Sequence, residues 1–89
     1  MATLVPVEED FVFKAAAFKH GVPEADILNA FEQRLFDHAF PGEGHKNLLI
    51  GFDRNGIPLE VIYNVLDGGA VNVFHAMKCR KAYLDLLEA

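Results

Sequence analysis

Two turn signals in the middle of the chain restrict its fold more than any other feature. The dipeptide Asn-Gly at 55–56 and the tripeptide Asp-Gly-Gly at 67–69 are each flanked by runs of β-branched and aromatic residues. Such turns between apolar runs are typical of β-hairpins. Two successive hairpins predict a three-stranded antiparallel meander, and a weaker apolar run at 35–40 predicts a strand before it. We therefore expect a four-stranded antiparallel sheet.

Helical patterns lie on both sides of this region. Segment 8–19 begins with three acidic residues and predicts a first helix, because apolar residues recur in it at helical spacing. Gly21 suits the end of that helix and Pro23 suits the start of a second one. The stripe expected to be buried on the second helix consists of Ile27, Leu28, Phe31 and Leu35. From about residue 76 the chain has helical spacing again, with a stripe made of Met77, Arg80, Leu84 and Leu87. The expected fold is α+β, with two N-terminal helices, a four-stranded antiparallel meander sheet and a C-terminal helix.

The turns also set the register of the predicted sheet. With a two-residue turn at 55–56, Ile50 pairs with Val61, and a shift of one residue would exchange the two faces. The face expected beneath the helices carries Leu48, Ile50, Phe52, Ile57, Leu59, Val61, Tyr63, Val65 and Phe74. The opposite face carries Leu49, Gly51, Asp53, Glu60, Ile62, Asn64, Val71, Val73 and His75. This register puts His75 directly across from Glu60 or one diagonal away.

Length and composition limit the classes of protein to consider. The 89 residues suffice for one domain, which we place at 1–89. Hydrophobic residues make up 52% of the chain, yet no apolar run approaches the roughly 20 residues of a membrane helix. The start, MATLVPVEED, lacks the pattern of a signal peptide, and a single cysteine excludes an internal disulfide. We expect a cytoplasmic protein that does not enter a membrane.

The charge distribution is uneven. A net charge of −5 argues against a broad surface for polyanions. Positive charge is local, because residues 68–84 contain three cations, Lys78, Arg80 and Lys81, and no acidic residue. Lys78 and Lys81 either bind an anionic substrate or are simply solvated. Arg80, on an apolar stripe, must be ion-paired, at the edge of the core, or functional.

Glu60 and His75 form the candidate catalytic pair. A carboxylate beside an imidazole can move protons near neutral pH, and Gly51 next to Glu60 leaves room for a ligand. Lys78 and Arg80 would stabilise developing negative charge. Together these are the parts that a metal-independent ribonuclease needs. The structural alternative is a cross-strand hydrogen bond that satisfies two half-buried polar groups.

For four further residues the sequence leaves two possible roles open. Lys19 and His20 either contact substrate or interact with the end of the first helix. Tyr83 either stacks on a base or packs against its own helix. Cys79, flanked by cations early in a helix, is either a reactive thiol or a small buried side chain. No spacing typical of metal ligands occurs, so we expect neither a metal nor a cofactor.

Three segments of the chain together resemble the BrnT-type toxins of bacterial type II toxin-antitoxin systems, which are similar to RelE-like ribonucleases. The segments are FKHGVPEADILNAF, NLLIGFDRNGIPLEVIYNV and VNVFHAMKCRKAYLDLL. The resemblance implies a RelE-like fold, cleavage of RNA (including RNA on the ribosome), and neutralisation by a small DNA-binding antitoxin. By position, Lys19 and His20 match the family's K-H-G-V motif, and Arg80 and Lys81 match the basic start of its last helix. Met77 stands where better-known members have arginine, and the chain is acidic where such toxins are usually basic.

Three functional interpretations follow. The first is a toxin-like ribonuclease acting without metal, with Glu60, His75 and Arg80 as catalytic residues. The second is a non-catalytic protein-interaction module of the same fold. Its interface would consist of Leu49, Ile62, Val71 and Val73. The third is an enzyme based on the thiol of Cys79.

Overall fold

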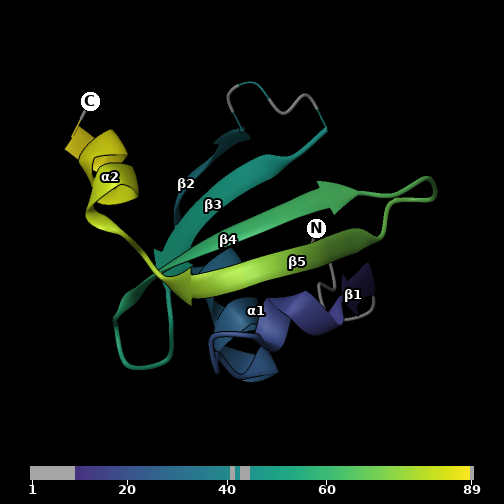
Figure 1. Cartoon of the computed structure of the whole chain (residues 1–89), viewed down its shortest axis with the longest axis horizontal. Coiled ribbons are helices and arrows are strands. Elements are labelled where there is room, and N and C mark those ends of the chain that lie inside the picture. Colours follow the sequence, from purple (N-terminus) through teal and green to yellow (C-terminus); the bar gives the residue numbers. More distant parts are fainter. Residues whose placement is uncertain (1–9, 41, 43–44, 89) are drawn as a thin grey trace, which may run out of the picture.

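Five strands form one sheet in the order β1-β5-β4-β3-β2 (Figure 1). The computed structural model describes residues 10–40, 42 and 45–88. The strands are β1 (Phe11–Phe13), β2 (Arg34–Ala39), β3 (Asn47–Phe52), β4 (Pro58–Val65) and β5 (Val71–Lys78). The helical elements are η2 (Ala15–Phe18), α1 (Glu24–Glu32), α2 (Lys81–Leu84) and η3 (Asp85–Glu88). Strand β1 runs parallel to β5, whereas all the other neighbouring strands are antiparallel.

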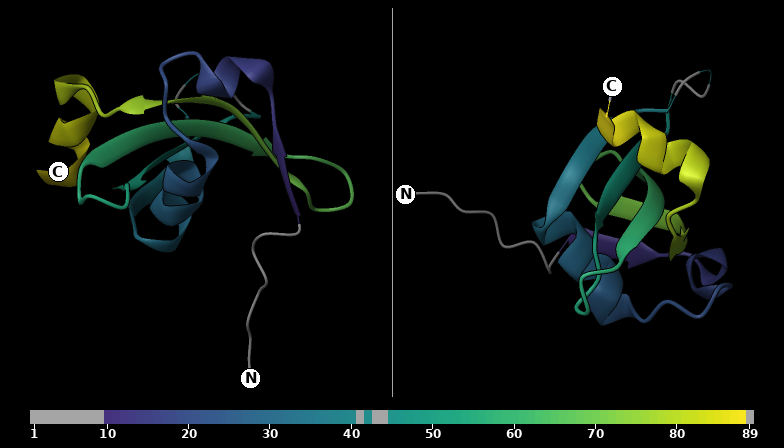
Figure 2. Two further views of the ribbon diagram at one scale, coloured as in Figure 1. Left: turned by 90° about the horizontal axis from the view of Figure 1, so that it is seen from below. Right: turned by 90° about the vertical axis from the view of Figure 1, so that its left-hand side faces the viewer.

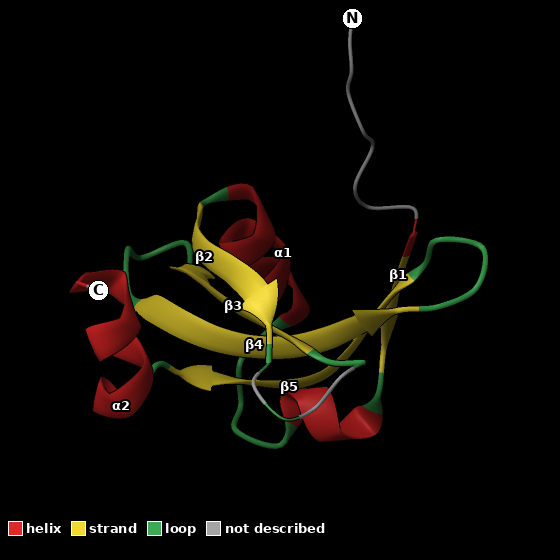
Figure 3. Cartoon of the chain, turned by 90° about the horizontal axis from the view of Figure 1, so that it is seen from above, coloured by secondary structure: helices red, strands yellow, loops and turns green. Residues whose placement is uncertain are grey.

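The expected fold class is wrong at the N-terminus, where a strand and a 3-10 helix replace the first predicted helix. Segment 11–13 pairs with 71–73 of β5, and Figure 3 shows β1 beside the start of that strand. Phe11 packs edge-on against Phe31, with ring centroids 4.9 Å apart. Two phenylalanines separated by one exposed valine suit a half-buried strand better than a helix. The sheet is therefore mixed and five-stranded, not a four-stranded antiparallel meander. Residues 8 and 9 of the predicted helix lie outside the described part.

The second predicted helix is present but shorter. Pro23 has extended backbone and precedes α1, whose first turn contains Glu24 and Asp26; acidic side chains are favoured there by the helix dipole. Ile27 and Phe31 are buried as expected. Leu35 lies in β2 instead, where 46% of it is exposed, because α1 ends at residue 32 and the chain extends directly into a strand.

One face of the sheet, called the α1 face below, is covered by α1, and η2 packs against β5 beside it. The core at this face contains Ala17, Ile27, Ala30, Phe31, Leu49, Leu59, Val61, Tyr63, Val73 and Ala76. Gly51 lets α1 approach β3 closely, because a Cβ at this position would lie 2.0 Å from the carbonyl oxygen of Ala30. The other face, called the site face below, carries Ile50, Glu60, Ile62 and His75, as the strand pairing requires.

The predicted pairing of β3 with β4 is wrong by one residue. Ile50 pairs with Glu60 instead of Val61, and Leu49 pairs with Val61. The cause is a three-residue loop, 54–56, in place of the two-residue turn. Asp53 closes it, since its Oδ1 accepts hydrogen bonds from the backbone N–H groups of Asn55 and Ile57, both at 2.8 Å. Gly56, at φ 81°, supplies the left-handed residue that such a loop requires. The shift puts Leu49 and Gly51 on the α1 face and Leu48 and Ile50 on the site face.

The pairing of β4 with β5 is also shifted by its loop, and a β-bulge in β5 reverses this shift partway along the strand. The hairpin after β4 also has a three-residue loop, closed by a 2.8 Å hydrogen bond from Leu66 N–H to the Ala70 carbonyl. Tyr63 pairs with Val73 and Ile62 with His75, which leaves Phe74 as the extra residue. Val71 and Val73 therefore face α1, contrary to expectation, whereas His75 returns to the site face.

The C-terminal helix starts later than predicted. Strand β5 continues to residue 78, and α2 begins at 81 after Arg80, which has extended backbone. Arg80 is therefore not part of a helical stripe. Helices α2 and η3 lie at the end of the sheet where β5 ends, away from α1 (Figure 2). None of the helices in the described residues is long and apolar enough to cross a membrane.

Candidate functional site

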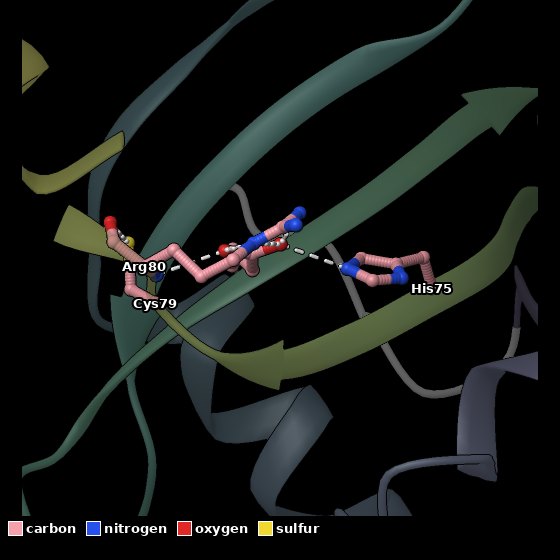
Figure 4. Close-up of polar contacts among 4 residues, drawn as sticks. His75, Cys79 and Arg80 are labelled. Atoms are coloured by element: carbon pink, nitrogen blue, oxygen red, sulfur yellow. Dashed lines mark hydrogen bonds and ion pairs between the residues drawn. The ribbon is translucent and has the colours of Figure 1, made fainter. Parts of the chain in front are cut away.

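Glu60 lies at the centre of a polar cluster on the site face. Its side chain is fully buried and accepts hydrogen bonds from two residues of the following segment (Figure 4). His75 Nε2 lies 2.9 Å from Oε2. Arg80 Nη2 lies 2.6 Å from the same oxygen, and the backbone N–H of Arg80 lies 2.9 Å from Oε1. Arg80 Nε contacts both oxygens, at 3.1 and 3.2 Å.

The strand pairing and the end of β5 build this cluster. His75 is opposite Ile62, so its ring reaches Glu60 along the diagonal on one face of the sheet. Beyond β5, the backbone N–H of Cys79 still bonds to the carbonyl of Pro58 at 2.9 Å, which keeps the chain beside β4. Arg80 follows directly and folds its side chain over Glu60. The structure thus brings together the three residues predicted to be catalytic.

The contacts of Glu60 determine its charge. Burial by itself raises the pKa of the carboxyl, but the hydrogen bonds from Arg80 and His75 outweigh it, so that the pKa lies below its ordinary value. The same pairing raises the pKa of Arg80. Glu60 is therefore an ionised acceptor at neutral pH, and it is suited to orienting His75 rather than to exchanging protons itself.

The contact with Glu60 also fixes how His75 can act. An ionised carboxylate only accepts hydrogen bonds, so Nε2 of His75 must be the donor. In the neutral imidazole the lone pair is then at Nδ1, which is the atom able to take a proton. The His75 side chain is 23% exposed, so this ring is held from the protein side and remains accessible from solvent.

A second imidazole lies next to the first. The ring of His20 is 5.5 Å from that of His75, centroid to centroid, in an edge-on arrangement. His20 is exposed in the corner between η2 and α1, and the exposed Lys19 precedes it as the C-terminal cap of η2. The predicted Lys-His pair is thus carried to the β5 edge, where His20 joins the cluster directly.

Of the remaining residues predicted to bind substrate, one lies beside the cluster and two lie away from it. The Arg80 guanidinium lies 5.2 Å from the ring centroid of Tyr83, so Tyr83 flanks the cluster. Lys81 is turned away from it and forms a 3.1 Å ion pair with Asp85, in which its side chain is 86% exposed. Lys78 is exposed at the end of β5 and lines a groove that is also lined by His20.

Cys79 does not have the character of a reactive thiol. Burial and the nearby charge of Glu60 raise its pKa to about 11. The thiolate form is therefore scarce near neutral pH, which decides against a reactive thiol among the two alternatives for this residue. The proposed interaction surface is also contradicted in part, because Leu49 and Val73 are completely buried in the core.

Sequence reasoning missed two contacts near the site. Phe40 packs against Tyr83, with ring centroids 6.0 Å apart, and no local pattern links the two residues because they belong to distant segments. The Asp26 carboxylate accepts hydrogen bonds from the backbone and Nε of Arg54, at 3.0 and 2.7 Å, and these hydrogen bonds lower its pKa. This pair ties the start of α1 to the loop between β3 and β4.

The chain was compared with protein-family models, with curated proteins and with solved structures, and none of them matches. Within the described residues, no group of three or more histidine, cysteine or acidic side chains is arranged to hold a metal ion.

Proposed function

We propose that this chain is the toxin-like component of a bacterial toxin-antitoxin system and cleaves RNA in the cytoplasm without a metal. The observation that carries the proposal is the buried Glu60 carboxylate, which holds two partly exposed side chains, His75 at 2.9 Å and Arg80 at 2.6 Å. The sequence resemblance to BrnT-type toxins supports the choice of RNA as substrate.

In the proposed reaction His75 is the general base. Its Nδ1 takes the proton of a ribose 2′-hydroxyl, and the 2′-oxygen forms a bond to the adjacent phosphorus. The bond from phosphorus to the 5′-oxygen breaks, and the leaving oxygen takes a proton from a ring nitrogen of His20. The products are a 2′,3′-cyclic phosphate and a 5′-hydroxyl end. Glu60 acts as a positioning residue, because it fixes the tautomer and the orientation of His75.

Arg80 is the candidate for stabilising the transition-state charge. Its Nε and Nη2 groups bind Glu60, whereas Nη1 makes no hydrogen bond to any other residue that the structure describes. The Arg80 side chain is 55% exposed, so this nitrogen is accessible to a non-bridging phosphate oxygen. Tyr83, against the guanidinium, would stack on a neighbouring base.

A small DNA-binding antitoxin is the proposed partner. This part of the proposal rests on the three sequence segments that resemble BrnT-type toxins. Coexpression with a short reading frame that adjoins the gene should restore growth if the partner exists, and the two chains should purify together.

The test is induced expression in a bacterium, combined with cleavage of purified RNA in the presence of EDTA. Wild type should arrest growth and cut RNA, whereas His75→Ala and Arg80→Ala should each abolish both effects while remaining folded. His38→Ala is the matched control, because His38 is exposed in β2 beside Phe36 and outside the cluster. Cleavage that persists in both site variants would refute the assignment.

A non-catalytic protein-interaction module is the second candidate. The observation in its favour is that Arg80 and Glu60 largely neutralise each other, as a structural ion pair would. Of the interface residues first expected, half-buried Ile62 is the one on the site face. This function predicts no RNA cleavage, together with a protein partner whose binding is lost in Ile62→Glu.

A further inference from the structure

A groove of about 360 Å³ is lined by His20, the residue whose ring lies against His75. It is bounded by the corner before α1 with the start of that helix, the loop after β3, the start of β4 and the end of β5. Its apolar lining comes from Val22, Leu59 and Met77. Apolar walls with a few polar groups are typical of sites for small flat ligands.

The groove adjoins the proposed catalytic site at one residue. His20 belongs to both, since it lines the groove and its ring lies 5.5 Å from that of His75. Lys78 also lines the groove, on the α1 face opposite Leu59, whereas His75 is on the site face of the same strand. A nucleotide adjoining the phosphate at His75 would reach the groove by passing over the edge of β5 beside His20.

The polar groups of the groove favour a base over a phosphate. Asp26 is neutralised by its ion pair with Arg54 at 2.7 Å. The carboxylate of Asp53 is fixed in place because its Oδ1 accepts hydrogen bonds from the backbone N–H groups of Asn55 and Ile57. Its Oδ2 makes no hydrogen bond to another described residue and remains an acceptor. A carboxylate oxygen at the edge of an apolar slot pairs with an exocyclic amino group and repels a carbonyl.

We propose that this groove binds the base of the nucleotide next to the cleaved phosphate, and that Asp53 selects a base with an exocyclic amino group over uracil. The inference rests on the proposed function, of which it specifies the substrate. His20 would stack on the base, as aromatic side chains do in single-stranded RNA recognition.

Binding can be measured separately from cleavage. Titration with GMP, CMP, AMP and UMP, followed by amide NMR, should shift the signals of Val22 and Lys78. The three nucleotides with amino groups should bind about threefold to tenfold more tightly than UMP, as expected for one hydrogen bond. Equal affinities, or shifts confined to other parts of the molecule, would overturn the inference.

Asp53→Asn is the decisive variant. Asparagine keeps an oxygen for the Asn55 and Ile57 N–H groups but replaces the other carboxylate oxygen with an amino donor, so the preference should move toward UMP. Asp67→Asn, in the exposed loop after β4, is the control and should change nothing. An unchanged preference in Asp53→Asn would also overturn the inference.

The two proposals fail in different ways. RNA cleavage that requires His75 but shows no base preference would refute the base site and leave the nuclease intact. Selective nucleotide binding at the groove without any RNA cleavage would support the base site and refute the nuclease.

Discussion

His75 contacts Glu60 although its paired neighbour on β4 is Ile62. The His75 side chain is 23% exposed, and its Nε2 is held by the buried carboxylate. Arg80 completes the arrangement from the segment after β5, so a span of six residues supplies both partners of Glu60. An anion buried on a sheet face is stable here because each of its oxygens accepts hydrogen bonds from these partners.

Replacing Glu60 with glutamine should reduce both stability and activity. The amide cannot hold Arg80 by charge, and it no longer forces Nε2 of His75 to be the donor. We expect a loss of about 1–3 kcal/mol in the free energy of unfolding and roughly a 10- to 100-fold fall in RNA cleavage. Urea denaturation and an RNA cleavage assay measure the two effects. Glu32→Gln, exposed at the end of α1, should behave as wild type; a stable, fully active Glu60→Gln would contradict the positioning role.

The stability of the protein should fall in acid because of Glu60 and Asp26. The ordinary pKa values, which hold in an unfolded chain, are about 4.5 for Glu60 and 3.8 for Asp26. In the folded protein the pKa of each carboxyl lies below its ordinary value. Their contribution is complete above those ordinary values. It is lost as the pH falls through the lower folded values, because the unfolded state then binds more protons. Unfolding measured from pH 7 down to about pH 2 should show this decline, and Glu60→Gln should show less of it. An equal decline in the variant would mean that Glu60 is not the group responsible.

Gly51→Ala should destabilise the fold severely. The added Cβ would lie 2.0 Å from the Ala30 carbonyl oxygen, which is backbone and can move only if α1 moves away from β3. We expect a loss of about 3 kcal/mol or more in the free energy of unfolding, measured by thermal or urea denaturation. Gly21→Ala is the comparison, since no atom would meet its Cβ and only the left-handed φ of 80° opposes the change. Its cost should be about 1–2 kcal/mol; equal losses in the two variants would refute the steric explanation.

Cys79 should react slowly with alkylating agents. Its raised pKa of about 11 leaves little thiolate at neutral pH, so iodoacetamide should modify it far more slowly than a free cysteine at pH 7 and faster as the pH rises. Mass spectrometry follows the reaction. Cys79→Ser should retain RNA cleavage. Rapid alkylation at neutral pH, or loss of cleavage in the serine variant, would revive a thiol-based mechanism.

The sequence predicted the three central strands well because their turns contain glycine in a recognisable context. It did not predict the register, since both loops have three residues, and the number of loop residues depends on contacts such as those of Asp53 rather than on composition. Strand β1 was missed because three residues carry almost no periodicity, and their partner on β5 lies some sixty positions away. Pairing with a distant segment decides such a short strand, and local propensity does not.

The candidate site was predicted more accurately than the register from which it was derived. The contact between Glu60 and His75 was expected either directly or along one diagonal, and the structure has the diagonal. Beyond the bulge at Phe74, Ile62 pairs with His75, as a two-residue turn at 68–69 would also require. Arg80 was placed near Glu60 on the assumption of a helix, yet it reaches the carboxylate from extended backbone. The groove lined by His20 was not foreseen, because its walls come from four separate segments.

The extra residue at Phe74 divides β5 into two halves whose side chains contribute to opposite faces of the sheet. The first half supplies Val73 to the packing beneath α1, and the second half supplies His75 to the reactive surface. In an evenly alternating strand, Val73 and His75 would point to the same face, so one of them would leave its present position. The one-residue bulge is consequently as necessary to the site as any side chain nearby, because it alone lets two residues of like position in the strand point to opposite faces.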